Sequence, residues 1–286
     1  ACLVGSEMCI RDRKTNIVNR AVSSNVQVSG GVSAGVTAGS QSANTVGAVV
    51  AVSNLKNDVR ADITQTQRNT GALRHVGTLQ NEAVSGMTQI GAAIGVGVAS
   101  GSGSSTALTG SFAINNFANK TAAQLTNVTL TADSASVRAD DKHAASEYKD
   151  YLEKRGVAAS GDGYQKDFAK GKSNSSLAVD KNGDLTESRG STIVTAAASM
   201  SVATGSNAST AAGLGVGVGV IENDFTAGVK GSDLDIKGAQ GLAVESVADT
   251  RVVNVAVGAA GSGSTAVAGS ASVIVTKNNT SALVED

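Results

Sequence analysis

Four side-chain oxygens that could bind a cation lie close together in one short stretch of the chain. They belong to Asp180, Asn182, Asp184 and Glu187, at positions 1, 3, 5 and 8 of the stretch. Carboxylate and amide oxygens are the ligands that Ca²⁺ prefers. An EF-hand loop has its glycine at position 6 and its glutamate at position 12, whereas here Gly183 is at position 4. We therefore expect a solvated turn, with a calcium site as the alternative.

The residues that most often carry catalysis are scattered. His75 and His143 have no cysteine or histidine cluster near them, so neither has metal-ligand spacing. Ser102 and Ser262 each lie between two glycines, but no strand–turn–helix pattern surrounds them, as it would around a hydrolase nucleophile. Acidic residues are sparse outside residues 138–189, so no carboxylate pair suggests glycoside cleavage. We expect no enzymatic activity and no cofactor.

Residues 138–190 are predicted to form a charged, partly helical insertion. They contain 20 of the 47 charged side chains, ten of each sign, and all three tyrosines. Asp141 could cap a helix over residues 142–155, which Gly156 would end. Tyrosine is enriched at binding hot spots; the alternative is that these tyrosines pack a small core of the insertion. The candidate binding residues are Tyr148, Tyr151 and Tyr164.

An internal repeat must position these residues. Each copy begins with a Gly-Ser dipeptide and reaches an asparagine 18, 18, 18 and 17 residues later. The dipeptides begin at Gly39, Gly101, Gly205 and Gly261, and the asparagines are Asn57, Asn119, Asn223 and Asn278. The asparagines are 62, 104 and 55 residues apart, so the second interval contains the insertion. Such recurrence is typical of stacked repeats, each of which packs on its neighbours.

Within each copy, apolar and small residues alternate. Leu214, Val216 and Val218 alternate with glycines, and this period of two predicts strands. Glycine weakens a strand unless another backbone approaches closely, so one face should pack tightly against a second layer. The predicted unit is a strand, a Gly-Ser turn, a strand and an asparagine-containing corner. We predict an all-β repetitive β-solenoid, with stacked β-hairpins closed at the Gly-Ser turns as the alternative.

Composition narrows the class of partner. The chain has 286 residues, a net charge of −1, 2% aromatic residues and no proline. A near-neutral charge argues against a nucleic-acid partner, which would require a basic face. The longest apolar run, residues 90–99, is shorter than the ~20 residues that a membrane-spanning helix needs. We expect neither nucleic-acid binding nor a membrane-spanning segment in this fragment.

The first 13 residues look foreign to the fold. They contain both cysteines, Cys2 and Cys9, and match the translation of a sequencing-library adapter, so we set them aside. The fourth repeat is expected to be truncated at the C-terminus. The predicted segments are 1–13, an adapter artefact; 14–137, a β-repeat region; 138–190, the insertion; and 191–286, a second β-repeat region.

The repeats resemble a known family. The stretches Ala266-Val267-Ala268-Gly269-Ser270-Ala271-Ser272-Val273 and Asn278-Asn279-Thr280-Ser281-Ala282 are similar to passenger repeats of large bacterial filamentous adhesins, the leukotoxin-type, filamentous-haemagglutinin-like proteins exported by two-partner secretion or related routes. The resemblance covers most of residues 17–286 except the insertion. It implies a right-handed parallel β-helix on the surface of a Gram-negative-type cell, and it provides no catalytic residues to transfer.

The expected function is therefore structural. The fragment would be a stalk or passenger segment of a secreted or surface-displayed, outer-membrane-associated bacterial adhesin. Its partners would be flanking repeats of the same chain and an unidentified host or bacterial surface ligand. The alternatives are a β-helical polysaccharide-processing enzyme and a self-associating biofilm matrix protein.

Overall fold

The computed structural model describes residues 15–65, 75–141 and 190–286, and within them all regular structure is β-strand. The strands are unusually long, most of them 21 to 27 residues. In chain order they are β1 (Thr15–Gly39), β2 (Ala43–Thr64), β3 (His75–Gly101), β4 (Ser105–Thr126), β5 (Thr129–Asp141), β6 (Thr192–Gly205), β7 (Ser209–Lys230), β8 (Asp233–Val247), β9 (Arg251–Ser262) and β10 (Thr265–Glu285).

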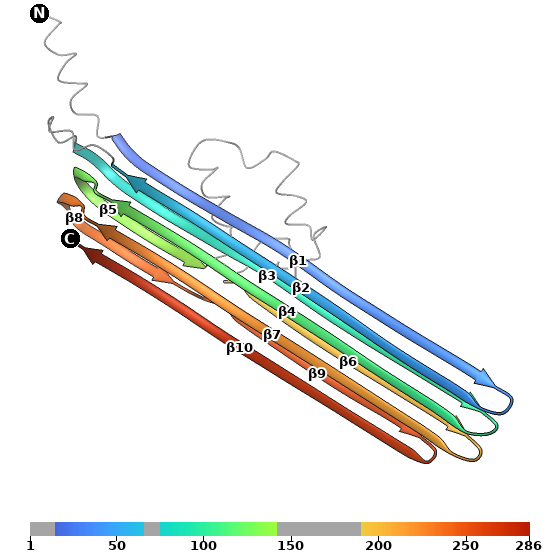
Figure 1. Ribbon diagram of the computed structural model, residues 1–286. Helices are drawn as coiled ribbons and strands as arrows, with labels where there is room; N and C mark the ends of the chain where they lie inside the picture. Colours follow the sequence, from blue (N-terminus) through green and yellow to red (C-terminus); the bar gives the residue numbers. More distant parts are fainter. Residues whose placement is uncertain (1–14, 66–74, 142–189) are drawn as a thin grey trace, which may run out of the picture.

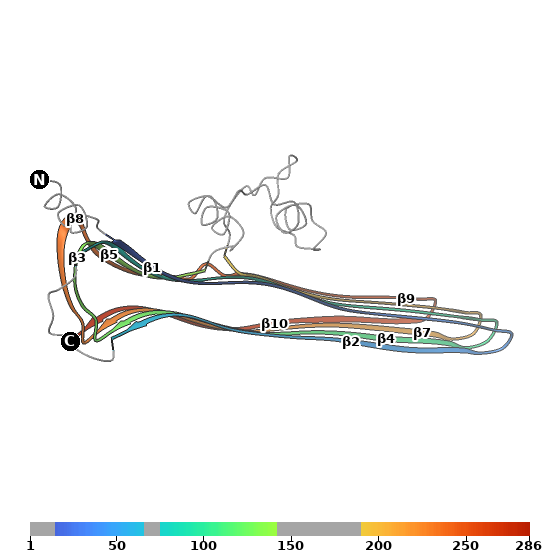
Figure 2. The ribbon, with the colours of Figure 1, turned by 90° about the horizontal axis from the view of Figure 1, so that it is seen from above.

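The long strands run side by side (Figure 1) and form two parallel sheets that face each other (Figure 2). Sheet A contains β1, β3, β5, β6, β8 and β9, and sheet B contains β2, β4, β7 and β10. The chain runs along sheet A, turns, and returns along sheet B. We call one such circuit a pass, and the described residues contain four passes. Strands joined by a Gly-Ser turn lie in different sheets, and every described pairing is parallel. Hydrogen-bonded hairpins are thus the wrong alternative, and the parallel architecture is consistent with a β-helix-like fold.

The third and fourth passes are divided in sheet A. Strand β5 pairs with the first half of β3, and β6 pairs with its second half. In the fourth pass, β8 lies beside β5 and β9 beside β6. The insertion therefore lies between two pieces of what is a single strand in the pass before. Strand β5 extends to Asp141, so it includes residues 138–141, which the sequence pattern had placed in the insertion.

The predicted asparagine corner is wrong. Asn57, Asn119, Asn223 and Asn278 align in register as the repeat predicts, but they lie inside β2, β4, β7 and β10. A different asparagine makes a corner: Asn127, between β4 and β5, has φ 56°. Gly231 does the same after β7 with φ 55°. Asparagine and glycine tolerate this left-handed backbone, which most residues avoid.

The expected close packing of a glycine-bearing face is confirmed. In the first half of β7 the alternating glycines, Gly213, Gly215, Gly217 and Gly219, point inward, and Leu214 and Val220 point outward. A Cβ on Gly213 would collide with the carbonyl oxygen of Ala259, and one on Gly215 with that of Val257. The two sheets are so close here that only glycine fits between them.

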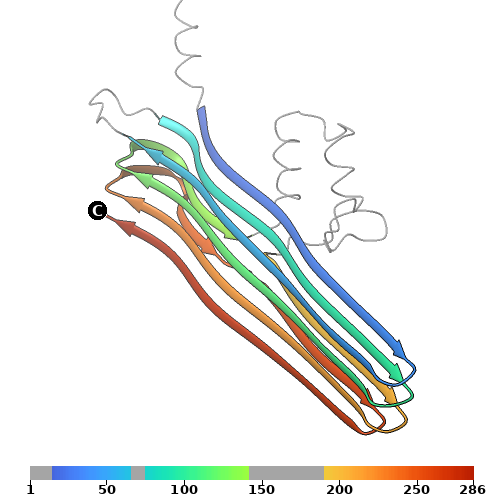
Figure 3. The ribbon, with the colours of Figure 1, turned by 45° about the vertical axis from the view of Figure 1, so that its right-hand side comes forward.

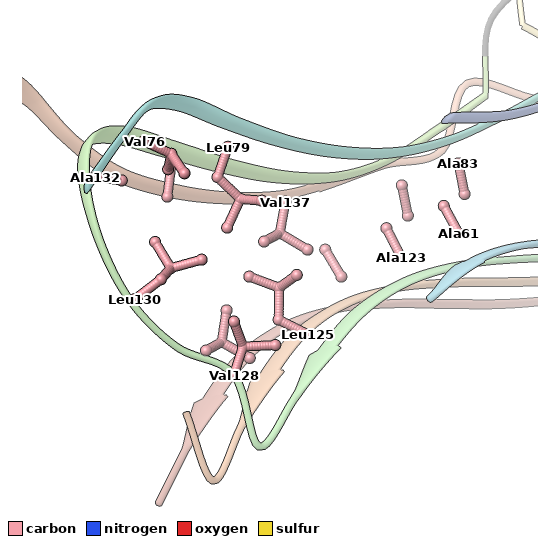
Figure 4. Packing of buried hydrophobic residues seen from close by; sticks show 14 of the residues in the cluster. Ala61, Val76, Leu79, Ala83, Ala123, Leu125, Val128, Leu130, Ala132 and Val137 are labelled. Atoms are coloured by element: carbon pink, nitrogen blue, oxygen red, sulfur yellow. The ribbon is translucent and has the colours of Figure 1, made fainter. Parts of the chain in front are cut away.

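The interior widens from the Gly-Ser turns to the opposite end, following the size of the inward side chains (Figure 2). The cluster beside the turns contains alanines alone. The next contains alanines with Val49, and the one after it Met87, Phe117, Ile193 and Ile221. The opposite end, where the strands curl (Figure 3), encloses leucines and valines that include Leu79, Leu125 and Val137 (Figure 4).

The fourth Gly-Ser turn differs from the first three. In the first three passes the turns stack, and the Ser102 hydroxyl donates to the carbonyl of Ser40. In the fourth pass Ser262 pairs with Ala203, and Thr265 pairs with Thr210. Between these paired positions the fourth pass has two residues where the third has six, so Gly261-Ser262 does not stack on Gly205-Ser206.

Inward glycines should resist substitution far more than outward ones of the same strand. Gly215→Ala in β7 should lower the free energy of unfolding by about 1–3 kcal/mol, because the methyl group overpacks the interior. Gly228→Ala is the matched control, since its Cβ would meet only the Gln124 side chain at 3.9 Å. Denaturant unfolding followed by circular dichroism measures both. Equal losses would contradict the close approach of the sheets.

Candidate functional site

Most residues predicted to act lie outside the described ranges. These are the tyrosines Tyr148, Tyr151 and Tyr164 and the candidate calcium ligands Asp180, Asn182, Asp184 and Glu187. His143, for which no role is predicted, lies outside the described ranges as well. The point at which the chain leaves sheet A for this segment is described, and it forms an ordered polar site. Four residues, which we call the junction site, make it: Asp141, Ser191, Asn223 and Thr250.

Asp141 and Ser191 join the two ends of the interrupted strand. The backbone N–H of Ser191 donates to Asp141 Oδ1 at 2.9 Å, and its hydroxyl donates to the same oxygen at 2.7 Å. Ser191 Oγ also accepts from the backbone N–H of Met87 in β3 at 3.2 Å. Asp141 and Ser191 are both buried. The insertion thus leaves from a closed, hydrogen-bonded base.

The junction site continues across the interior to sheet B. Thr250, between β8 and β9, donates its hydroxyl to Asp141 Oδ2 at 2.9 Å. Asn223 in β7 donates to Thr250 Oγ1 at 3.0 Å and to Asn278 Oδ1 in β10 at 2.9 Å. One connected set of hydrogen bonds therefore links the insertion base to the neighbouring pass and to the facing sheet.

Simpler versions of this bridge occur in the first two passes. Ser23 donates to Asn57 Oδ1 at 3.0 Å, and Asn119 donates to Ser85 Oγ at 2.8 Å. In the register of sheet A, Ser23 lies beside Ser85, and Ser85 beside Asp141. The third pass thus has a carboxylate where the first two have a serine.

Burial dominates the electrostatics of the junction site. It raises the pKa of Asp141 from 3.8 to about 6, because the charged form loses hydration, while the hydrogen bonds from Ser191 and Thr250 oppose the increase. The arrangement can hold a proton near neutral pH and can hold strands together. A nucleophilic serine would need a nearby base such as histidine. The described histidine, His75, is exposed and hydrogen-bonded to Asp133. His75 lies ten residues, or about 33 Å, from Ser85, the residue of β3 that pairs with Asp141.

Sequence reasoning missed the junction site because its members are far apart in the chain. The sequence pattern predicts that Asp141 caps a helix over residues 142–155, which lie outside the described ranges. In the structure its oxygens accept hydrogen bonds from Ser191 and Thr250. The available signal was the spacing of Ser23, Ser85 and Asp141, since each pass places a polar residue at this level of the stack. Neither a metal-binding cluster of acidic, cysteine or histidine residues nor a membrane-crossing helix occurs in residues 15–65, 75–141 and 190–286.

A second candidate surface is the outer side of both sheets. Val32 and Val36 in sheet A and Val46 in sheet B are 76–77% exposed. Sheet B has a shallow apolar depression of about 340 Å³ on this side, between Val46, Leu108, Leu214 and Val267. Contiguous apolar surfaces of this kind often mark sites of association.

Comparisons with known proteins do not assign either surface. No protein-family model, no curated protein and no solved structure matches the chain. The function is therefore inferred from the geometry.

The stability of the protein should depend on Asp141 in an unusual direction. The folded state raises the pKa of this carboxyl, so its contribution to stability is complete below pH 4 and is lost as the pH rises through about 6. The loss is about 3 kcal/mol between these limits. Asp141→Asn should remove this dependence, measured as the difference in unfolding free energy between wild type and variant from pH 4 to 7. The exposed Asp235→Asn is the control, and a constant difference for Asp141→Asn would refute the assignment.

Proposed function

We propose that this chain is a structural segment of a secreted or surface-displayed bacterial adhesin. Its repeated passes would form a right-handed parallel β-helix associated with the outer membrane. The supporting observation is the register: each described strand pairs in parallel with the equivalent strand of the next pass, so the chain builds surface by repetition. The resemblance of its repeats to filamentous adhesins provides the biological setting.

The dimensions favour a broad passenger segment over a slender stalk. A 27-residue strand such as β3 is about 90 Å long, whereas each pass adds only about 4.8 Å in the stacking direction. The passes therefore make a wide, thin slab whose outer faces and insertion are displayed. In this proposal the slab carries the insertion, and Tyr148, Tyr151 and Tyr164 contact the surface ligand.

A self-associating matrix protein is the second candidate. Its supporting observations are the exposed valines on both outer sides and the strands at the ends of the two sheets. Exposed edge strands are templates for pairing with another chain.

Replacing residues 142–189 with a short Gly/Ser linker tests where adhesion resides. The chain would be displayed on a Gram-negative cell by a secretion signal and an outer-membrane anchor, and attachment of the cells to host cells would be counted. We expect attachment to fall to background, because the proposed contacts lie in the insertion. The β-sheet circular dichroism of the purified variant should persist, because Asp141 and Ser191 remain.

A second variant replaces only the three tyrosines with serine, and it should lose attachment too. Unchanged attachment by the linker variant would indicate that the contact with the host cell lies on the strands. Absence of attachment by the intact displayed chain would count against the adhesin proposal itself.

A further inference from the structure

The described stack ends in two strand edges that differ from each other. At one end, β1 and β2 form the edges of sheets A and B, and we call these the leading edge. At the other end, β8 and β9 of sheet A and β10 of sheet B form the trailing edge. Within the described residues no further strand pairs with either edge. Each edge therefore presents backbone groups that can pair with an added strand.

Two of the three rungs in the asparagine ladder of sheet B share one direction, whereas in the middle rung Asn119 donates to Ser85 instead. Asn57 donates its side-chain N–H to Asn119 Oδ1 at 3.0 Å, and Asn223 donates to Asn278 Oδ1 at 2.9 Å. The acceptor is in the later pass in both cases. At the trailing edge, Asn278 is placed to donate to an asparagine of a further pass, and Asn57 of the leading edge is such an asparagine.

A charge ladder in sheet A alternates in sign. Arg20 lies beside Glu82, Glu82 beside Arg138, and Arg138 beside Glu245. The end pairs are ion pairs of 3.5 Å. The ladder ends at the trailing edge in a carboxylate, so the next pass should present a cation. The leading edge presents Arg20.

The two ladders specify compatible registers. Asn278 and Asn57 are 221 positions apart, and Glu245 and Arg20 are 225 apart. The difference of four residues equals the shortening at the fourth Gly-Ser turn, where two residues lie between the paired positions in place of six. A leading edge on this trailing edge would thus meet the mismatch in turn length that passes three and four already accommodate. The alanine ladder Ala61, Ala123, Ala227 and Ala282 would continue with a second Ala61.

We propose that the trailing edge binds the leading edge of a second copy of this chain, in the register that places Asn278 beside Asn57 and Glu245 beside Arg20. This head-to-tail contact joins two different edges, so it does not close into a dimer and adds copies indefinitely. It goes beyond the proposed adhesin function, and it concerns edges on which no further pass of the same chain is stacked. One unfavourable pair is built into this register, because Lys277 would lie beside Lys56.

Disulfide trapping tests the register. In a Cys2→Ser/Cys9→Ser background, Arg60→Cys and Ser281→Cys place two outward thiols on opposite edges, because Ser281, Thr226, Ala122 and Arg60 occupy one ladder. Adjacent strands are about 4.8 Å apart, within disulfide reach. The control pairs Ser281→Cys with Asp62→Cys, which the register separates by about 8 Å. Oxidation should give dimers, trimers and longer chains on a non-reducing denaturing gel for the first pair and at least fivefold less for the control.

Lys56→Glu tests the same contact in the opposite direction. It replaces a repulsive pair with Lys277 by an attractive one, so the association constant from sedimentation should rise by roughly threefold to fivefold. Lys237→Glu, in β8 but with its partner Asp235 in the same strand, is the control for net charge. Monomers alone, or equal cross-linking of the two cysteine pairs, would overturn the proposal. Because these assays use soluble protein, their failure is distinct from a failure of surface attachment.

Discussion

The small size of the inward side chains is the constraint on which the rest of the structure depends. Near the Gly-Ser turns the interior contains alanine, glycine, serine and threonine, and the sheets approach until backbone nearly touches backbone. Because bulky residues cannot enter, the valines and leucines of these strands lie on the outer sides. The tight packing of the interior therefore makes the outer surfaces apolar. These apolar surfaces are then available for association.

The same thin interior determines its hydrogen bonds. A polar group buried without a partner is costly, and here short side chains reach the facing sheet directly. Asn81 donates to the carbonyls of Ala61 and Gln124, and Gln89 donates to Ser53. These bonds fix the register of the passes relative to each other, which alanine contacts alone would do weakly. The junction site belongs to this set of bridges, extended by a carboxylate where the insertion leaves.

The sequence was sufficient to predict strands, Gly-Ser turns and a stack of repeats, because a period of two combined with a fixed offset is typical of stacked strands. Outside the glycine-bearing stretch of residues 213–219, it could not show which set of alternating residues faces inward, since alternation is symmetric until the second layer is known. Asn57 and its equivalents were misplaced because asparagine suits both corners and ladders, and only the register separates the two uses. Thr250 and Asp141 are 109 residues apart, so their contact depended on the whole stack.

Distances between spin labels on the first and last passes test the parallel stack most directly. Val52 and Val273 lie on the outer side of sheet B in one ladder, through Ile114 and Val218. Three strand spacings separate them, so their Cα atoms should be about 14 Å apart. A single narrow distribution of label distances consistent with this value would support four stacked passes. A broad distribution, or one centred beyond about 40 Å, would contradict the stack, because β2 and β10 would then belong to separate units.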